Sequence, residues 1–259
     1  MMAGPALARP LLLPLVSSCT QTDHDMPGPV QTNGMSSAAA ALQMLERRQA
    51  VLANNLANAS TRGFKGEMAF SRVMGNALAA TDTAVDLTQG TLTQTHNPFD
   101  LAVEGDGFFV VNTPNGERFV RNGSFTLNAN RQLVDGKGNA VMSENGPITI
   151  PNGRVDIDAS GQIQINGKPL AMLRVERVAS GADLQHEGGT MFVPDASRQS
   201  IPASERKVQQ GFLEESNVNA MSAMTDMLSV LHRYQAAQKT LSTIDAVRGI
   251  AVTDLAKPV

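Results

Sequence analysis

The C-terminal part of the chain carries the feature that most constrains its fold, a long helical pattern with a narrow apolar stripe. Ser216 or Asn217 can cap this helix, which we expect over about 217–251. The large residues of the stripe recur mostly three, four or seven positions apart: Met221, Met224, Leu228, Leu231, Tyr234, Leu241, Ile244 and Val247. This spacing is close to the roughly 3.5-residue repeat of a coiled-coil seam. A lone helix cannot bury such a stripe, so it needs another helix, from this chain or from another.

A second helical pattern lies over about 36–59. Ser36 and Ser37 can cap it, and the alanine run that follows favours helix. Four leucines share one face of the predicted helix: Leu42, Leu45, Leu52 and Leu56. Asparagine, serine, threonine and glycine cluster from Asn58 to Gly63, where the helix should end.

Between Leu101 and Val193 the apolar period changes to two, which is typical of strands. Asn-Gly or Asp-Gly pairs, which favour tight hairpin turns, begin at Asn115, Asn122, Asp135, Asn145 and Asn152. The stretch 155–165 reads as a further hairpin. We therefore expect a central antiparallel all-β domain over 100–205, preceded by an extended connector over 64–99 with one or two strands.

Residues 1–34 are rich in proline and glycine and read as a disordered or misassigned N-terminal extension, with Met26 and Met35 as alternative starts. The apolar run from Leu11 to Val16, before Cys19, imitates a lipoprotein signal. It is shorter than the usual apolar region of about 7–15 residues. A lipid anchor at Cys19 nevertheless stays open as an alternative.

Composition excludes several classes of protein. The formal net charge of −3 lacks the basic excess of a nucleic-acid binder. One cysteine rules out an internal disulfide, and the four histidines lack metal-binding spacing. Gly105-Asp106-Gly107 precedes two phenylalanines and reads as a turn, and the stretch 156–161 lacks the glutamate that a calcium loop needs. We expect no enzyme activity, cofactor, metal or small-molecule substrate. Because aromatics form 4% of the chain, we expect Leu, Val, Ile and Met to supply most of the core.

These patterns predict an α+β chain in which terminal helices form a coiled-coil-like bundle and flank the β-domain. The expected parts are the extension 1–34, an N-terminal assembly helix within 35–63, the connector 64–99, the β-domain 100–205 and a C-terminal segment with an assembly helix, 206–259.

Four stretches resemble the motifs of one known family, in the family's order. They are Ala53–Lys65 (ANNLANASTRGFK), Asp100–Val110 (DLAVEGDGFFV), Arg121–Leu127 (RNGSFTL) and Gly211–Asn219 (GFLEESNVN). Together they resemble the flagellar basal-body rod and hook proteins over about residues 35–250. The stretch Glu144–Pro151 favours the proximal-rod type, whereas Gly107–Phe109 and Ser216–Asn219 are shared with the distal-rod type, which stays an alternative.

The resemblance implies a structural rod subunit, located in the periplasmic rod of the basal body and serving motility. Its partners would be further copies of itself and other rod and hook proteins. It would be exported through the flagellar type III apparatus, its terminal helices would form an inner tube, and its β-domain would lie outside. We also expect the ends to fold on assembly.

The residues expected at the assembly interface come from both helical ends: Leu42, Leu45, Leu52, Asn54, Asn55, Leu56, Asn58, Asn217, Asn219, Met221, Met224, Leu228, Leu231, Leu241, Ile244 and Val247. The asparagines can instead cap their own helices, and the stripe can instead pack only on the chain's first helix. Two other functions remain alternatives, a surface-anchored β-domain binding module and an enzyme carried on a rod-like scaffold.

Overall fold

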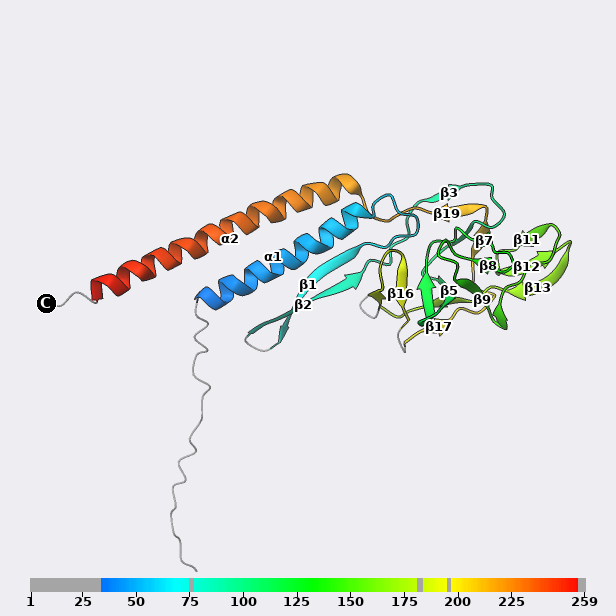
Figure 1. The fold of residues 1–259 in the computed structure, drawn as a ribbon, viewed down its shortest axis with the longest axis horizontal. Coiled ribbons are helices and arrows are strands. Elements are labelled where there is room, and N and C mark those ends of the chain that lie inside the picture. Colours follow the sequence, from blue (N-terminus) through cyan, green and yellow to red (C-terminus); the bar gives the residue numbers. More distant parts are fainter. Residues whose placement is uncertain (1–33, 75–76, 181–183, 195–196, 256–259) are drawn as a thin grey trace, which may run out of the picture. The chain divides into compact units, whose positions relative to one another are not determined.

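The computed structural model describes residues 34–74, 77–180, 184–194 and 197–255 (Figure 1). Two helices, α1 (Gly34–Ala57) and α2 (Ala220–Leu255), enclose all of its strands in the sequence. This order confirms the α+β class. The predicted extension, up to residue 33 and including Cys19, lies outside the described residues. In the part that is described, no helix combines the length and apolar character needed to cross a membrane.

The helices begin and end close to the predicted bounds. Helix α2 starts at Ala220, later than expected, because Asn219 caps it and neither Ser216 nor Asn217 does so. The Ser222 amide donates to Asn219 Oδ1 at 3.1 Å, which satisfies one of the free N–H groups at a helix start.

Helices α1 and α2 pack against each other and run in opposite directions (Figure 1). The Tyr234 hydroxyl donates to Glu46 Oε1 at 3.0 Å, which marks the residues that lie level with each other on the two helices. In an antiparallel pair, residue numbers rise along one helix in the direction in which they fall along the other. Gly34 therefore lies level with about residue 246 of α2, and the remaining turns of α2 extend past the described part of α1.

The strands alternate in chain order with short turns. They are β1 (Glu67–Met74), β2 (Ala77–Val85), β3 (Leu92–Gln94), β4 (Leu101–Val103), β5 (Phe108–Thr113), β6 (Gly116–Val120), β7 (Thr126–Leu127), β8 (Leu133–Val134), β9 (Ala140–Ser143), β10 (Gly146–Pro147), β11 (Val155–Ile157), β12 (Gln162–Ile165), β13 (Lys168–Met172), β14 (Val175–Arg177), β15 (Gln185–His186), β16 (Met191–Val193), β17 (Gln199–Ser200), β18 (Val208–Gln210) and β19 (Phe212–Glu214). The segment predicted as a connector with one or two strands holds β1, β2 and β3.

The main sheet is antiparallel and runs in the order β15-β16-β6-β5-β9-β8-β7, with β10 on β9 and β14 between β5 and β17. Three of the predicted tight turns join paired strands, at Asn115, Asp135 and Asn145. The pair at Asn122 does not. A Cβ on Gly123 would lie 1.7 Å from the Leu101 carbonyl oxygen, so this glycine permits close approach of two backbones. The pair at Asn152 precedes β11 without joining it to a paired neighbour.

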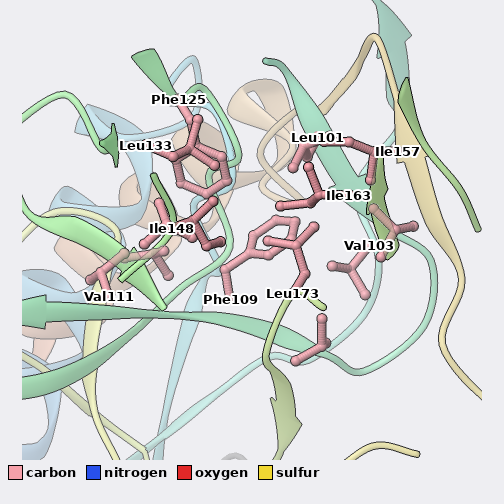
Figure 2. Packing of buried hydrophobic residues seen from close by; sticks show 14 of the residues in the cluster. Leu101, Val103, Phe109, Val111, Phe125, Leu133, Ile148, Ile157, Ile163 and Leu173 are labelled. Atoms are coloured by element: carbon pink, nitrogen blue, oxygen red, sulfur yellow. The ribbon is translucent and has the colours of Figure 1, made fainter. Parts of the chain in front are cut away.

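Strand β5 occupies the centre of the core, because both of its faces are covered. Alternate residues point to opposite sides of a strand. Phe109 and Val111 enter the larger cluster with Ile163 and Leu173 (Figure 2), whereas Phe108 and Val110 enter a second cluster. The expectation that Leu, Val, Ile and Met would supply most of the core is confirmed, because these residues form the larger part of the buried apolar set. Phenylalanines are few, but several of them are fully buried: Phe64, Phe108, Phe109, Phe119, Phe125 and Phe192.

The segment before α2 returns to the start of the β-domain. Strand β18 pairs with β4, and β19 pairs with β3. The Gly211 amide also donates to the Asp100 carbonyl at 2.7 Å. The C-terminal motif therefore lies beside the connector and the central motif, although more than a hundred residues separate them in sequence.

Candidate assembly interface

Helix α2 presents two apolar faces. On the first, buried or half-buried residues follow each other at alternating spacings of four and three: Ala223, Met227, Val230, Tyr234, Ala237, Leu241 and Ile244. On the second, Met221, Met224 and Leu228 are 75%, 49% and 59% exposed. Val247, on the turns beyond α1, is also exposed. We call Met221, Met224, Leu228 and Val247 the exposed set.

The structure therefore divides the stripe that the sequence predicts. Leu231, Leu241 and Ile244 are half-buried, whereas the exposed set remains in solvent. The sequence pattern missed Ala223 and Met227, because spacings of three and four fit both the buried or half-buried residues of the first face and the exposed set. Val230, which is buried, was also missed.

Helix α1 shows the same kind of spacing. The four predicted leucines, Leu42, Leu45, Leu52 and Leu56, are all half-buried on one face of the helix, which contacts α2. Val51 and Asn55 are buried on the side that carries the β1–β2 contact. Helix α1 is therefore held between α2 and the β1–β2 hairpin.

The asparagines at the end of α1 have partners within the chain. Asn58 Nδ2 donates to Asn54 Oδ1 at 2.8 Å, and the Thr61 hydroxyl donates to Asn58 Oδ1 at 3.2 Å, so these two asparagines close the helix locally. Asn55 makes a two-way contact with the backbone of Glu67: its Nδ2 donates at 2.8 Å and its Oδ1 accepts at 2.9 Å. Asn55 therefore fastens β1 to α1.

Asn217 performs a similar task before α2. Its Oδ1 accepts the Gly66 amide at 2.8 Å, and its Nδ2 donates to the carbonyls of Asp86 and Thr88 at 2.9 and 3.1 Å. Asn219, by contrast, is exposed and caps α2. Contacts of any of these asparagines to other subunits stay a prediction.

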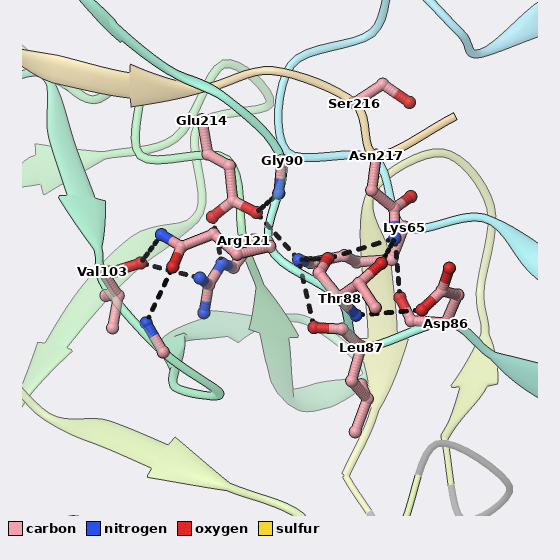
Figure 3. Close-up of polar contacts among 12 residues, drawn as sticks. Lys65, Asp86, Leu87, Thr88, Gly90, Val103, Arg121, Glu214, Ser216 and Asn217 are labelled. Atoms are coloured by element: carbon pink, nitrogen blue, oxygen red, sulfur yellow. Dashed lines mark hydrogen bonds and ion pairs between the residues drawn. The ribbon is translucent and has the colours of Figure 1, made fainter. Parts of the chain in front are cut away.

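A buried ionic cluster, which we call the joint, lies where the chain leaves α1 and where it approaches α2. It consists of Lys65, Arg121 and Glu214, and each side chain is 1% exposed. Lys65 Nζ lies 2.8 Å from Glu214 Oε1, and Arg121 Nε donates to Glu214 Oε2 (Figure 3). One carboxylate thus serves two cations.

Backbone carbonyls supply the remaining acceptors of the joint. Lys65 Nζ donates to Thr88 at 2.6 Å, and Arg121 donates to Val103 at 2.7 Å and also to Gly107. Burial, and then the charge of Arg121, lowers the pKa of the Lys65 ammonium. Because a buried charge is tolerated only when it is paired and hydrogen-bonded, these contacts explain how three ions can be buried together.

Close backbone packing surrounds the joint. Gly63 has φ of 66°, its amide donates to the Glu214 carbonyl at 2.7 Å, and a Cβ there would lie 2.4 Å from the Asn122 nitrogen. Next to it, the His186 ring lies between Phe64 and Phe192, with centroid distances of 5.7 and 4.3 Å.

His186 Nε2 is 3.4 Å from a carboxylate oxygen of Glu67. Burial lowers the pKa of His186, and the Glu67 charge opposes that effect without cancelling it. The sequence did not single out the joint or this histidine. The available signal was that Lys65, Arg121 and Glu214 each stand inside one of the family motifs, next to apolar or glycine residues.

The predicted absence of catalytic chemistry rests on the sequence. Among the residues that the structure describes, no three His, Cys, Asp or Glu side chains gather as a metal would require. Asp158, part of the stretch compared with a calcium loop, uses its Oδ1 to accept the amides of Ser160 and Gln162 in the β11–β12 turn.

Three family models match the chain. "Flagella basal body rod protein" matches residues 35–65, "Flagellar hook protein FlgE/F/G D1 domain" matches 102–165, and "Flagellar basal body rod FlgEFG protein C-terminal" matches 209–253. Lys65, Arg121 and Glu214 each come from a different one of these regions, so the joint is where the three regions meet.

Curated relatives agree with the family models. The flagellar basal-body rod protein FlgF of Escherichia coli is 34% identical over 237 residues, which cover 82% of this chain and 93% of the relative. FlgF of Rhizobium meliloti is 31% identical, covering 78% of this chain and 88% of the relative. The rod protein FlgG of Buchnera aphidicola is 29% identical, covering 75% and 89%. The family is structural and is located in the flagellar basal body. The chain belongs to the flagellar basal-body rod and hook protein family, and its FlgF relatives support the proximal-rod type that the motifs favour.

Proposed function

We propose that this rod subunit polymerises through its two terminal helices into the helical drive shaft of the flagellum. A helical filament needs heterologous contacts, in which different patches of neighbouring copies meet and the assembly never closes on itself. The exposed set on α2 supports this proposal. Its apolar side chains lie on a helix whose other apolar face is already covered by α1.

The half-buried series on α1 and α2 supports a coiled-coil-like bundle. Spacings of four and three repeat along both helices, as in a coiled-coil seam. In the assembled rod, we propose, the α1–α2 pairs form the inner layer and the β-domain lies outside. The division into extension, assembly helix, connector, β-domain and C-terminal segment is part of the same proposal.

The proposed partners are further copies of this chain, other rod and hook proteins, and the type III export apparatus that delivers the chain. The role is mechanical, and we propose no enzymatic step, nucleic acid or small-molecule substrate. The asparagines of the predicted interface act within the subunit in this proposal, as caps and clamps that set the angle of the helices. Contact between subunits is assigned to the exposed set.

A charge on the exposed set tests the proposal. Leu228→Glu places a carboxylate in the proposed contact, and Ser229→Glu places the same charge on the neighbouring exposed residue, outside the set. We expect cells with Leu228→Glu to lose swimming and complete basal bodies, because burial of an unpaired charge is strongly unfavourable. Cells with Ser229→Glu should swim.

Purified Leu228→Glu subunit should remain folded, as judged by circular dichroism. If cells with Leu228→Glu swim normally and build intact hooks, the exposed set is not the assembly surface.

A further inference from the structure

Among the residues that the structure describes, Glu214 is the only anion in direct contact with the two fully buried cations Lys65 and Arg121. This imbalance of charge has a consequence for folding. Lys65 and Arg121 together carry two positive charges, against one negative charge on Glu214. Asp86 also acts on Lys65, but its Oδ1 accepts the Thr88 amide. Without Glu214, the joint would bury two cations held only by carbonyl dipoles, which is a strongly unfavourable arrangement.

The three members of the joint arrive from distant parts of the chain. Lys65 and Glu214 are separated by 149 positions, and Arg121 and Glu214 by 93. Lys65 leads from α1 into β1, whereas Glu214 ends β19, shortly before α2. The backbone follows the same connections: the Gly63 amide donates to the Glu214 carbonyl, and the Glu215 amide donates to the Thr91 carbonyl.

We infer that Glu214 is the closing residue of a charge-balanced latch, which lets the α1 end dock on the β-domain only when the segment before α2 is also in place. Docking of Lys65 on its own would desolvate a second cation beside Arg121. Docking together with Glu214 gives both cations a partner. The two helical ends therefore become ordered together, and an incomplete chain keeps its α1 end undocked.

This inference concerns folding within one subunit, so it does not depend on polymerisation. It also separates a charge-balance role from simple packing. If the joint were only a packed cluster, loss of either Lys65 or Glu214 would open it to a similar degree. If charge balance decides, loss of the cation leaves one balanced Arg121–Glu214 pair, whereas loss of the anion leaves two unpaired cations.

The test is hydrogen exchange on the full-length chain, comparing Lys65→Met, Glu214→Gln and the double variant. The reporters of the joint are the amides of Gly63, Asp86 and Glu215, which bond to Glu214, Gly66 and Thr91. The reporters of the core are the amides of paired strands β5 and β6. Glu144→Gln serves as a control, because it removes an anion 2.6 Å from another buried arginine, Arg206, which otherwise bonds to the carbonyls of Ile201 and Leu173 and not to the joint.

We expect Glu214→Gln to speed exchange of the joint reporters by roughly a hundredfold or more, with the core reporters unchanged. In Lys65→Met, the exchange rates of the joint reporters should stay within about tenfold of those in the unaltered chain, because the balanced Arg121–Glu214 pair remains. In the double variant, the joint reporters should exchange at least about tenfold more slowly than in Glu214→Gln. The Glu144→Gln control should leave the joint reporters as they are.

Equal effects of Lys65→Met and Glu214→Gln would overturn the inference, and so would a double variant no better protected than Glu214→Gln. If Glu214→Gln does not fold at all, the double variant decides: recovery of folding on loss of Lys65 supports charge balance, and continued unfolding refutes it. A swimming defect with normal exchange would instead bear on the assembly surface alone.

Discussion

Val230 and Leu228 stand two positions apart on α2, yet Val230 is 2% exposed and Leu228 is 59% exposed. One residue faces the chain's own first helix and the other faces solvent. The two substitutions Val230→Ala and Leu228→Ala should therefore have different consequences, although both shorten an apolar side chain on the same helix.

Val230→Ala should lower the free energy of unfolding by about 2 kcal/mol, because it leaves a cavity between packed helices. Leu228→Ala should change it by less than about 0.5 kcal/mol, since little of its surface is buried in the subunit. Urea denaturation followed by circular dichroism measures both. Similar losses of stability would contradict the division of α2 into two faces.

Gly63 allows a second prediction about the joint. Gly63→Ala should destabilise the chain by about 2 kcal/mol or more, because the new Cβ meets the Asn122 backbone and an alanine resists positive φ. Gly136→Ala is the matched control, since the space around Gly136 is open within 4 Å. The control should lie within about 0.5 kcal/mol of the unaltered chain in the same urea titration. A tolerated Gly63→Ala would show that the backbone contact can relax.

Asn219 tests the start of α2. Asn219→Ala should cost about 1 kcal/mol of stability, because the Ser222 amide loses the side-chain acceptor that caps the helix. Asn219→Asp keeps an acceptor of similar reach and should retain the stability. Thermal unfolding of the three proteins gives the comparison. An equal loss in both variants would assign Asn219 a role other than capping.

His186 makes stability depend on pH. Burial lowers the pKa of this histidine in the folded chain, whereas in the unfolded chain it stays near 6.5. The unfolded chain therefore binds the proton first, and the free energy of unfolding should fall as pH drops below about 6.5, by at most about 1.4 kcal/mol per pH unit. The loss is complete once pH falls below the folded-state pKa.

The His186→Gln variant removes this titration while keeping a polar side chain beside Glu67. Its stability should change less between about pH 6.5 and 5.5 than that of the unaltered chain. Urea titrations at several pH values measure the two slopes. Parallel slopes in this window would mean that His186 keeps its ordinary pKa in the fold.

Sequence patterns predicted the helices and hairpins, because these elements are formed by residues that are close together in the sequence. The helix over 217–251 follows from apolar residues spaced mostly three, four or seven positions apart, and the hairpin over 155–165 follows from two apolar alternations around a turn. The expectation of a tight turn at each Asn-Gly or Asp-Gly pair is confirmed at Asn115, Asp135 and Asn145, where the pair lies between paired strands. It was wrong at Asn122, where the glycine instead admits the Leu101 carbonyl, a neighbour that local sequence does not reveal.

The joint could not be predicted in the same way, because its three members are far apart and each has ordinary surface-type chemistry. A lysine after Phe64 or a glutamate after Leu213 is most often solvated. Their burial depends on the pairing of β19 with β3, which no local pattern specifies. The two faces of α2 were merged for a related reason: Ala223 adds little hydrophobicity to the pattern, although it is buried in the fold.

The contact between Gly63 and Asn122 has a mechanical meaning. Main chain rests on main chain there, with no side chain between them. A side chain under load can change its rotamer and give way, but a peptide unit resists bending of its angles and planes. The contact between the segment that follows the first helix and the β-domain therefore contains no side-chain rotamer through which it could yield.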